Sequence, residues 1–272
     1  MLQVFATIKG INAASGLFLK GDLLYIIGDN SSFLYEYHLK DKRLNHFPLL
    51  GNPSPLENIP KADKPDFESV ALYENSLYVL GSGSTPKRNR MIEYRLDTRA
   101  VILHDLTTLY AAMKSAHAIA DEDLNIEGAI FTGSHWYLFN RGNGSGGKNG
   151  IFILKGADLS VAKNADFIGV KLPKENKVFV SFTDAILYEN KIYFIAAAED
   201  TTSTYNDGKI LGSYIGNLDL VTLKLKTFKK IAEHQKFEGL AFLGKKGAQL
   251  EFLICEDSDA ETARAIIYKV LL

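Results

Sequence analysis

The chain has a single cysteine, Cys255, and no long apolar segment. One cysteine excludes an internal disulfide and argues against a metal–thiolate cluster. No apolar run approaches the ~18 residues that a membrane-spanning helix needs. The first residues, MLQVFATIKG, lack the basic start and apolar stretch of a signal peptide. We therefore expect a cytoplasmic protein with no membrane partner, although a chain whose leader had been removed would read the same.

Neither sign of charge is in excess, because 31 Lys and Arg residues stand against 32 Asp and Glu residues. This balance gives no net field that would draw the chain to nucleic acid or to an anionic surface. The chain also lacks the His-Glu-x-x-His and Gly-x-Ser-x-Gly patterns of hydrolases. The stretch NRGNGSGG from Asn140 lacks the Gly-Lys-Ser/Thr ending of a phosphate-binding loop. Evidence for function must therefore come from residues that repeat along the chain.

One phrase does repeat: an acidic residue, a small residue, a short apolar run, a polar turn and a second apolar run. It is clearest in NIEGAIFTGSHWYLFN from Asn125, and it starts near residues 14, 68, 127, 183 and 238, every 54 to 59 residues. A period of that length, carried by strand-like segments, is typical of propeller blades. We predict an all-β chain in which residues 1–272 form a single five-bladed β-propeller domain, with six blades as the alternative.

Two segments lie outside the repeat. Leu2–Ile8 is strand-like but has no neighbour in sequence with which to pair, whereas the last blade is one strand short. We predict that Leu2–Ile8 pairs beside Ala265–Leu271 and closes the ring, which leaves no open sheet edge. Residues 105–118 carry apolar side chains at helical spacing and predict one short helix between the second and third blades.

Long polar loops gather at one end of the predicted ring. In a four-stranded blade, the loop after the second strand and the connection to the next blade share an end. Here these segments are long, as in GSGSTPKRNR from Gly81, whereas the turns after the first strands are short. Because long loops on a rigid scaffold commonly carry function, we expect the site at this end, near the axis.

Acidic residues open the first strands of four blades at this same end. They are Glu68, Glu127, Asp184 and Glu238, with Asp184 offset by one place. Thr183 takes the equivalent place in the fourth blade and Ala14 in the first. Carboxylates ~5 Å apart repel by roughly 3 kcal/mol per pair at an effective dielectric of ~20. A bound cation, raised pKa values or a basic partner must offset that repulsion.

Two interpretations of these acids remain open. Oxygen ligands from separate elements suit Ca²⁺ or another hard divalent cation, so the four acids are candidate metal ligands. The alternative is structural: each acid accepts backbone hydrogen bonds within its own blade.

Two further residues are candidates for catalysis. Arg141 directly follows the second strand of the third blade, and we predict that it orients an anionic group of a small-molecule ligand. His234 precedes Glu238 by four residues and is the candidate base. The alternatives for Arg141 are that it is solvated or that it pairs with one of the four acids. The alternative for His234 is a structural role. Other basic residues of these loops are Lys64, Arg88, Arg90 and Lys148.

The phrases PDFES, GSGS, LNIEGA, NRGNG, TDA, AAAEDT, YNDGKILGS and FEGLA, in this order, resemble an uncharacterised bacterial propeller family. More distantly, the acidic openings of the inner strands are similar to those of esterase-like phytase, SdiA-regulated and gluconolactonase/SMP-30 propellers. In the lactonases the Glu of a Glu-Gly opening helps to hold a central divalent metal. The resemblance implies that role for Glu127 or Glu238, although the Asn and Asp motifs that accompany it are not found in this chain.

Two hypotheses for function follow. In the first, the protein is a metal-dependent hydrolase of a small ester, lactone or phosphoester at the axial mouth, where a metal polarises the substrate. In the second, it is a non-catalytic propeller whose long-loop face binds a protein or a glycan.

Overall fold

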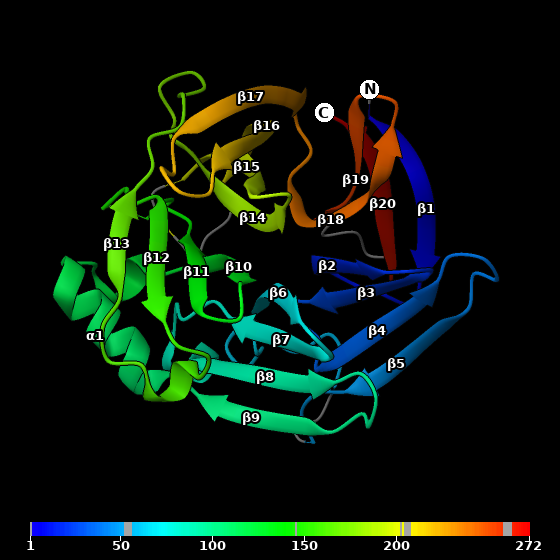
Figure 1. Cartoon of the computed structure of the whole chain (residues 1–272), viewed down its shortest axis with the longest axis horizontal. Helices are drawn as coiled ribbons and strands as arrows, with labels where there is room; N and C mark the ends of the chain where they lie inside the picture. The colour runs from blue at the N-terminus through cyan, green and yellow to red at the C-terminus, as the bar shows by residue number, and fades with distance from the viewer. Residues whose placement is uncertain (1, 52–55, 145, 202, 204–207, 258–262) are drawn as a thin grey trace.

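The structure, a computed structural model, describes residues 2–51, 56–144, 146–201, 203, 208–257 and 263–272. Among these residues, twenty strands form five four-stranded antiparallel sheets that stand around a central axis (Figure 1). The predicted five-bladed β-propeller is confirmed, and the six-bladed alternative is wrong.

Each blade runs outward from the axis in chain order. Blade one contains β2 (Ala14–Lys20), β3 (Leu23–Gly28), β4 (Phe33–His38) and β5 (Leu44–Pro48). Blade two contains β6 (Phe67–Tyr73), β7 (Ser76–Gly81), β8 (Arg90–Arg95) and β9 (Val101–Asp105). Blade three contains β10 (Ile126–Phe131), β11 (His135–Asn140), β12 (Gly150–Lys155) and β13 (Asp166–Gly169). Blade four contains β14 (Val180–Tyr188), β15 (Lys191–Asp200), β16 (Lys209–Asp219) and β17 (Leu225–Ala232).

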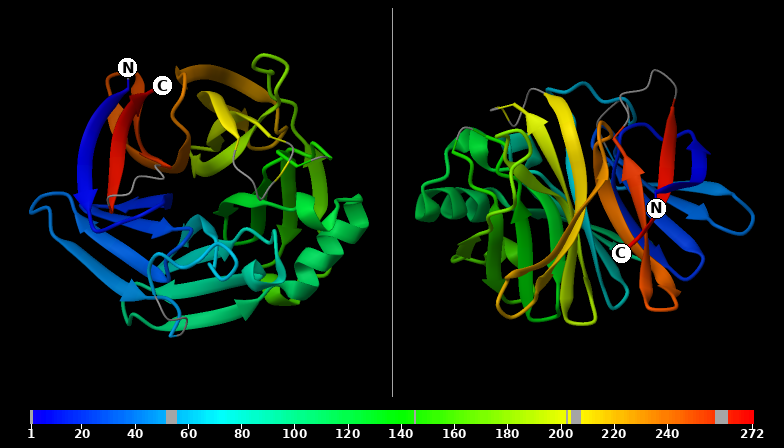
Figure 2. Two further views of the ribbon diagram at one scale, coloured as in Figure 1. Left: turned by 180° about the vertical axis from the view of Figure 1, so that it is seen from behind. Right: turned by 90° about the horizontal axis from the view of Figure 1, so that it is seen from above.

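Blade five joins the two ends of the chain. Its strands β18 (Phe237–Lys246), β19 (Gln249–Glu256) and β20 (Arg264–Leu271) are completed by β1 (Gln3–Lys9). β1 pairs antiparallel with β20, with Ile8 opposite Ala265, so both termini lie in one blade (Figure 2). The predicted closure of the ring by the N-terminal strand is confirmed.

The helix α1 (Thr107–His117) follows β9, where the sequence predicts a helix. The carboxylate of Asp105 accepts a hydrogen bond of 2.8 Å from the backbone N–H of Thr107, which holds the start of the helix. Leu109, Tyr110 and Met113 are buried in the apolar cluster between blades two and three. No helix in the described parts of the chain is long and apolar enough to cross a membrane.

The core is divided among the spaces between neighbouring blades, and each of five apolar clusters joins two adjacent blades. The inner strands approach very closely there. A Cβ on Gly239 would lie 2.7 Å from Cγ of Leu17, and one on Gly128 would lie 2.9 Å from the backbone N of Ala185. Close packing of the inner strands therefore explains the small residue in the repeated phrase.

Every first strand also carries a β-bulge near its start. The pairing with the second strand slips by one residue at Ser15, Glu68, Glu127, Thr183 and Glu238. A bulge redirects the side chain of the extra residue. The equivalent position in blade one is therefore Ser15, not Ala14 as the sequence comparison suggests.

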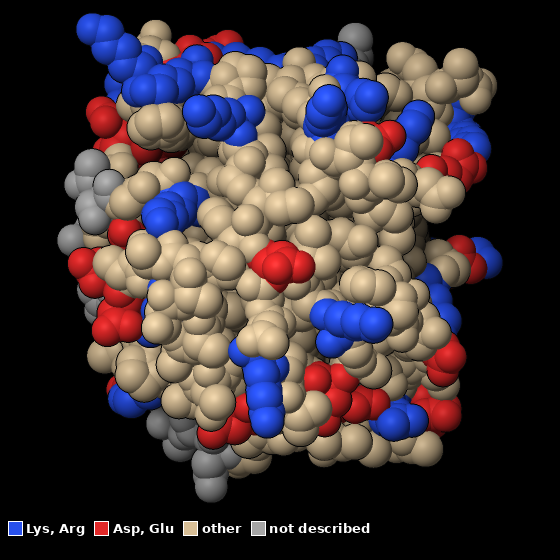
Figure 3. Space-filling view, turned by 60° about the vertical axis from the view of Figure 1, so that its left-hand side comes forward, with Lys and Arg blue, Asp and Glu red and all other residues tan. Residues whose placement is uncertain are grey.

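Charged side chains are dispersed on one side face of the ring (Figure 3). On the side face in Figure 3, basic and acidic side chains are interspersed among uncharged ones. Charge is concentrated instead in the cavity at the axis.

Candidate functional site

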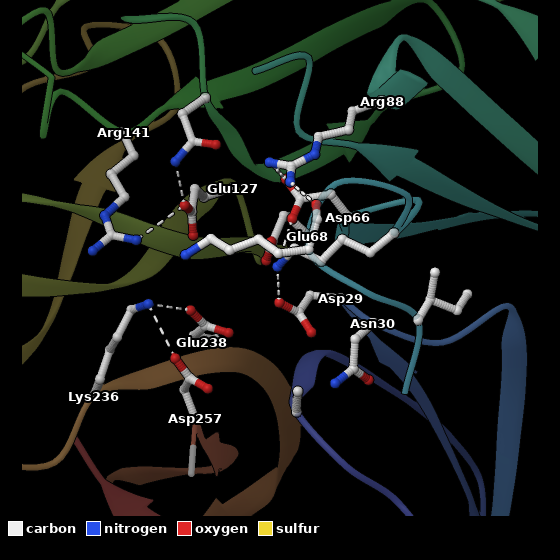
Figure 4. Close-up of a pocket in the computed structure, with 15 residues that line it drawn as sticks. Asp29, Asn30, Asp66, Glu68, Arg88, Glu127, Arg141, Lys236, Glu238 and Asp257 are labelled. Atoms are coloured by element: carbon white, nitrogen blue, oxygen red, sulfur yellow. Dashed lines mark hydrogen bonds and ion pairs between the residues drawn. The ribbon is translucent and has the colours of Figure 1, made fainter. Parts of the chain in front are cut away.

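A cavity of about 290 Å³ opens at the axial end where the long loops meet (Figure 4). Its walls come from the first strands, from the loops after the second strands and from the segments between blades, as the loop pattern predicts. Six acidic and five basic residues line it, and no aromatic residue does so among the described part of the chain. The charged residues are Asp29, Asp66, Glu68, Glu127, Glu238, Asp257, Lys61, Lys64, Arg88, Arg141 and Lys236.

Three of the four predicted metal ligands meet in this cavity. One carboxylate oxygen from each of Glu68, Glu127 and Glu238 lies within 4.8 Å of the other two. All three side chains are buried, with residue exposures of 8%, 3% and 6%. The bulges of blades two, three and five thus bring the three carboxylates together on the axis.

Asp184 is not among the residues that line the cavity. Its carboxylate accepts backbone hydrogen bonds from Ala185, at 2.6 Å, and from Leu240, at 2.7 Å, which joins blade four to blade five. Burial raises the pKa of Asp184 well above its usual range, and the two backbone donors oppose that shift. Asp184 therefore has the structural role that the alternative interpretation describes, except that one of its two backbone donors, Leu240, belongs to the next blade.

The bulge positions that lack an acid are also structural. The hydroxyl of Thr183 donates to the backbone carbonyl of Phe237 at 2.6 Å, and the hydroxyl of Ser15 donates to that of Phe67. Each hydroxyl thus holds the residue just before the ring glutamate of the next blade. Because a hydroxyl performs this structural task in two blades, the glutamates of the other three blades need a different explanation.

Buried and partly buried ion pairs surround the three glutamates. Arg141, itself buried, donates to Glu127 at 3.1 Å and to Glu199 on β15. Lys236 lies 2.7 Å from Glu238 and 3.1 Å from Asp257. Burial alone would lower the pKa of Arg141, but Glu127 and Glu199 together raise it. Arg141 is therefore the partner of a ring acid, one of the two alternatives left open by the sequence.

A second set of pairs lies on the side of blades one and two. Lys64 contacts Asp29 and lies 2.8 Å from Asp66, and Arg88 lies 2.8 Å from Asp66. The other two basic candidates do not line the cavity: Lys148 donates to the backbone carbonyl of His117 at 2.6 Å, and Arg90 lies on β8.

Two buried carboxylate oxygens of the three glutamates have no hydrogen-bond partner in the described part of the chain. Oε2 of Glu68 and Oε2 of Glu127 have no hydrogen-bond partner among the described residues. Oε1 of Glu127 is occupied, because it accepts from Asn125 at 2.6 Å and from Arg141. Burial raises the pKa of Glu68 well above its usual range, and Asp66, Glu238 and Glu127 add to the shift. Unpaired, buried, oxygen-only ligands fit a hard divalent cation.

His234 is separated from the ring. It is exposed and lines a neighbouring hollow of about 120 Å³, together with Glu199 and Glu256. Lys236 and Asp257 line both this hollow and the axial cavity, so they form the wall between them. The structure does not bring the candidate base to the three glutamates.

Several cavity residues escaped the sequence analysis although they repeat with the blades. Asp66, Asn125 and Lys236 stand two places before a ring glutamate. Asp29 and Asp257 directly follow the second strand of their blades, as the predicted residue Arg141 does in blade three. In blades one, three and five the two positions are joined, because Asp29, Arg141 and Asp257 each donate a backbone N–H to the residue two places before the bulge. Polar residues at these two repeat positions were the signal that could have found them.

The chain belongs to a family of unknown function, DUF6929, whose family model matches residues 10–272. This confirms the predicted membership of an uncharacterised propeller family. No curated protein matches the chain.

Solved structures share the fold at low identity. An endo-arabinase from Bacteroides thetaiotaomicron has a TM-score of 0.59 and 8% identity, with 99% of this chain and 98% of that chain covered. A glutaminyl cyclase from Myxococcus xanthus has a TM-score of 0.56 and 10% identity, with 100% and 97% covered. A luciferin-regenerating enzyme has a TM-score of 0.52 and 11% identity, with 99% and 94% covered. At these identities the likeness shows the propeller fold alone.

Proposed function

We propose that this member of DUF6929 binds a divalent cation in the axial cavity through Glu68, Glu127 and Glu238. The observation that carries the proposal is the pair of unpartnered, buried oxygens on Glu68 and Glu127, within a group of three ligand oxygens no more than 4.8 Å apart. Three carboxylates from separate strands supply the hard oxygen ligands that Ca²⁺, Mg²⁺ or Mn²⁺ prefers.

The ion pairs of Arg141 and Lys236 are compatible with a bound cation, because they do not use every carboxylate oxygen of the three glutamates. Arg141 and Lys236 each contact the Oε1 atom of their glutamate. Oε2 of Glu127 is left without a partner among the described residues. The basic side chains thus orient the carboxylates, in the way that groups behind metal ligands commonly do.

The same cavity supports a hydrolase of a small ester, lactone or phosphoester. A divalent cation, when bound, polarises a carbonyl or phosphoryl oxygen and lowers the pKa of a bound water. Arg141 is held between two carboxylates, so we assign it the orientation of Glu127 rather than direct contact with the anionic group of the ligand. Lys61 is exposed and lines the cavity, so it adds positive charge there.

Thermal melts test the cation site. We expect Ca²⁺, Mg²⁺ or Mn²⁺ to raise the melting temperature of the wild type above its value in EDTA. Mass action predicts a gain of roughly 2.7 kcal/mol at a hundred times the dissociation constant. Glu68→Gln should abolish this gain. It should also raise the melting temperature in EDTA, because each like-charged neighbour ~5 Å away costs roughly 3 kcal/mol at an effective dielectric of ~20.

The sign follows from the pKa of Glu68. Because the fold raises this pKa, ionised Glu68 destabilises the folded state at neutral pH, and a neutral amide removes that penalty. Glu74→Gln, an exposed carboxylate of the same blade outside the cavity, is the matched control and should respond to cations like the wild type. A wild type that melts alike in EDTA and in each cation would end the metal hypothesis.

Panels of candidate substrates distinguish a hydrolase from a non-catalytic binding protein. We expect turnover of an ester, a lactone or a phosphoester that rises on adding the cation and falls on Glu68→Gln. Assays with a pH indicator and assays of phosphate release, each with and without EDTA, measure this turnover. Cation-dependent stabilisation without turnover on any panel would instead favour a propeller whose long-loop face binds a protein or glycan.

A further inference from the structure

The axial cavity contains two groups of carboxylate oxygens with the spacing of a cation site, and the groups share Glu68. One is Glu68, Glu127 and Glu238, and the other is Asp29, Asp66 and Glu68. Each group offers three oxygens within 4.8 Å of one another. The two positions are therefore adjacent, and Glu68 stands between them (Figure 4).

The second group already contains a cation, the ammonium of Lys64. Its Nζ contacts Oδ2 of Asp29 and lies 2.8 Å from Oδ1 of Asp66. The Lys64 side chain is 13% exposed, so it is largely buried. Arg88 pairs with the remaining oxygen of Asp66 at 2.8 Å. Two carboxylates of this group thus have basic partners inside the protein.

The local chain holds Lys64 in that place. Its backbone N–H donates to the carbonyl of Pro60 at 2.9 Å, which forms a turn in the segment between blades one and two. Two residues later, Asp66 has a φ of 53° and donates its backbone N–H to Asp29 at 3.0 Å. These backbone hydrogen bonds hold the segments that carry Lys64, Asp66 and Asp29 beside one another.

We infer that Lys64 is a built-in cation that occupies the second of two adjacent cation positions and limits the cavity to one divalent ion. This rests on the proposed function. It assigns Lys64 the role of a specificity-determining residue: it closes the Asp29–Asp66–Glu68 position and leaves the Glu68–Glu127–Glu238 position for the ion. A cavity with one divalent ion lacks the paired ions that clamp the attacking and leaving oxygens in two-metal phosphoester hydrolysis. Carbonyl esters and lactones therefore come before phosphoesters in the substrate panel.

The number of ions bound per chain tests the inference. We expect equilibrium dialysis against Mn²⁺, with metal and protein measured separately, to give one ion for the wild type and two for Lys64→Met. Lys64→Met/Asp29→Asn should return to one, because it removes a ligand of the vacated position. Lys87→Met is the matched control. Lys87 pairs with Asp63, which lies in the same segment as Lys64, and its side chain is 59% exposed and does not line the cavity. We therefore expect one ion for this variant.

The two proposals fail differently. One ion for the wild type and one for folded Lys64→Met would overturn the role of Lys64 and leave the first cation site standing. No ion bound by the wild type would overturn the proposed function, and with it the premise for Lys64. If circular dichroism shows that Lys64→Met does not fold without cation, Lys64→Gln takes its place, because the amide still donates to one carboxylate while removing the charge. One ion for Lys64→Gln would count equally against the inference.

Discussion

Removing residues 1–8 is expected to lower the melting temperature of the whole propeller and to make the shortened chain self-associate. The deletion takes away most of β1, and with it Ile8, which is 3% exposed within the cluster between blades five and one. Burial of one such side chain contributes about 1.5–3 kcal/mol. Each ladder hydrogen bond to β20 adds about 0.5–1.5 kcal/mol. The loss falls where the two ends of the chain join.

Self-association follows from the edge that the deletion creates. Without β1, the outer side of β20 presents unpaired backbone groups, which can pair with another chain. Differential scanning calorimetry and light scattering after size exclusion measure the two effects.

A matched control keeps the strand and changes only its outer surface. Val4→Ser/Phe5→Ser alters two exposed side chains of β1 and leaves the pairing with β20 intact, so it should melt close to the wild type. A synthetic peptide of residues 1–9 added to the shortened chain should recover part of the lost stability. A monomeric deletion variant with the wild-type melting temperature would show that the inner strands alone close the ring.

The fold could be predicted from the sequence because every blade of a propeller places the same local requirements on its residues. An inner strand that approaches its neighbours closely needs a small residue, as at Gly128 and Gly239, and this need recurs with every blade. The unpaired strand at the N-terminus and the missing strand of blade five are complementary, which predicted their pairing. Both features can be recognised in the amino-acid sequence alone.

The site was harder to predict because one place in a strand separates two roles. Glu127 occupies a bulge and faces the cavity, whereas Asp184 lies one residue beyond the equivalent bulge and accepts backbone hydrogen bonds. In a strand, a shift by one residue turns the side chain to the other face. The offset of Asp184 was visible in the sequence, but its consequence depended on where the bulge falls.

The pairing of the basic residues was hard to predict for a different reason. Arg141 and Glu199 are 58 residues apart and lie in different blades, and no spacing rule connects them. Lys236 and Asp257 occupy two repeat positions that a backbone hydrogen bond joins, but the sequence does not show that their side chains pair with each other. The sequence predicts that acids gather at the axis, whereas the ion pairs that surround them depend on the geometry of the loops.

Arg141→Met is expected to be among the most destabilising single substitutions in this protein. It leaves Glu127 and Glu199 buried without their shared cation, and breaking a buried pair from one side typically costs about 3–5 kcal/mol. For a domain of this size each kcal/mol lowers the melting temperature by about 2–4 °C. Thermal melts in EDTA measure the loss.

A second substitution should reverse part of that loss, which distinguishes an orphaned charge from a packing defect. Arg141→Met/Glu199→Gln removes one of the two stranded carboxylates, so we expect it to melt above Arg141→Met, with a clear coupling energy in the double-mutant cycle. Millimolar Ca²⁺ should stabilise Arg141→Met more than the wild type if the ion binds at Glu127, because it restores positive charge beside the carboxylate that the arginine has left. Additive losses in the cycle would show that Arg141 stabilises the fold by filling space. A cation response equal to that of the wild type would place the ion away from Glu127, because an ion bound at that carboxylate must sense the charge of its nearest basic neighbour.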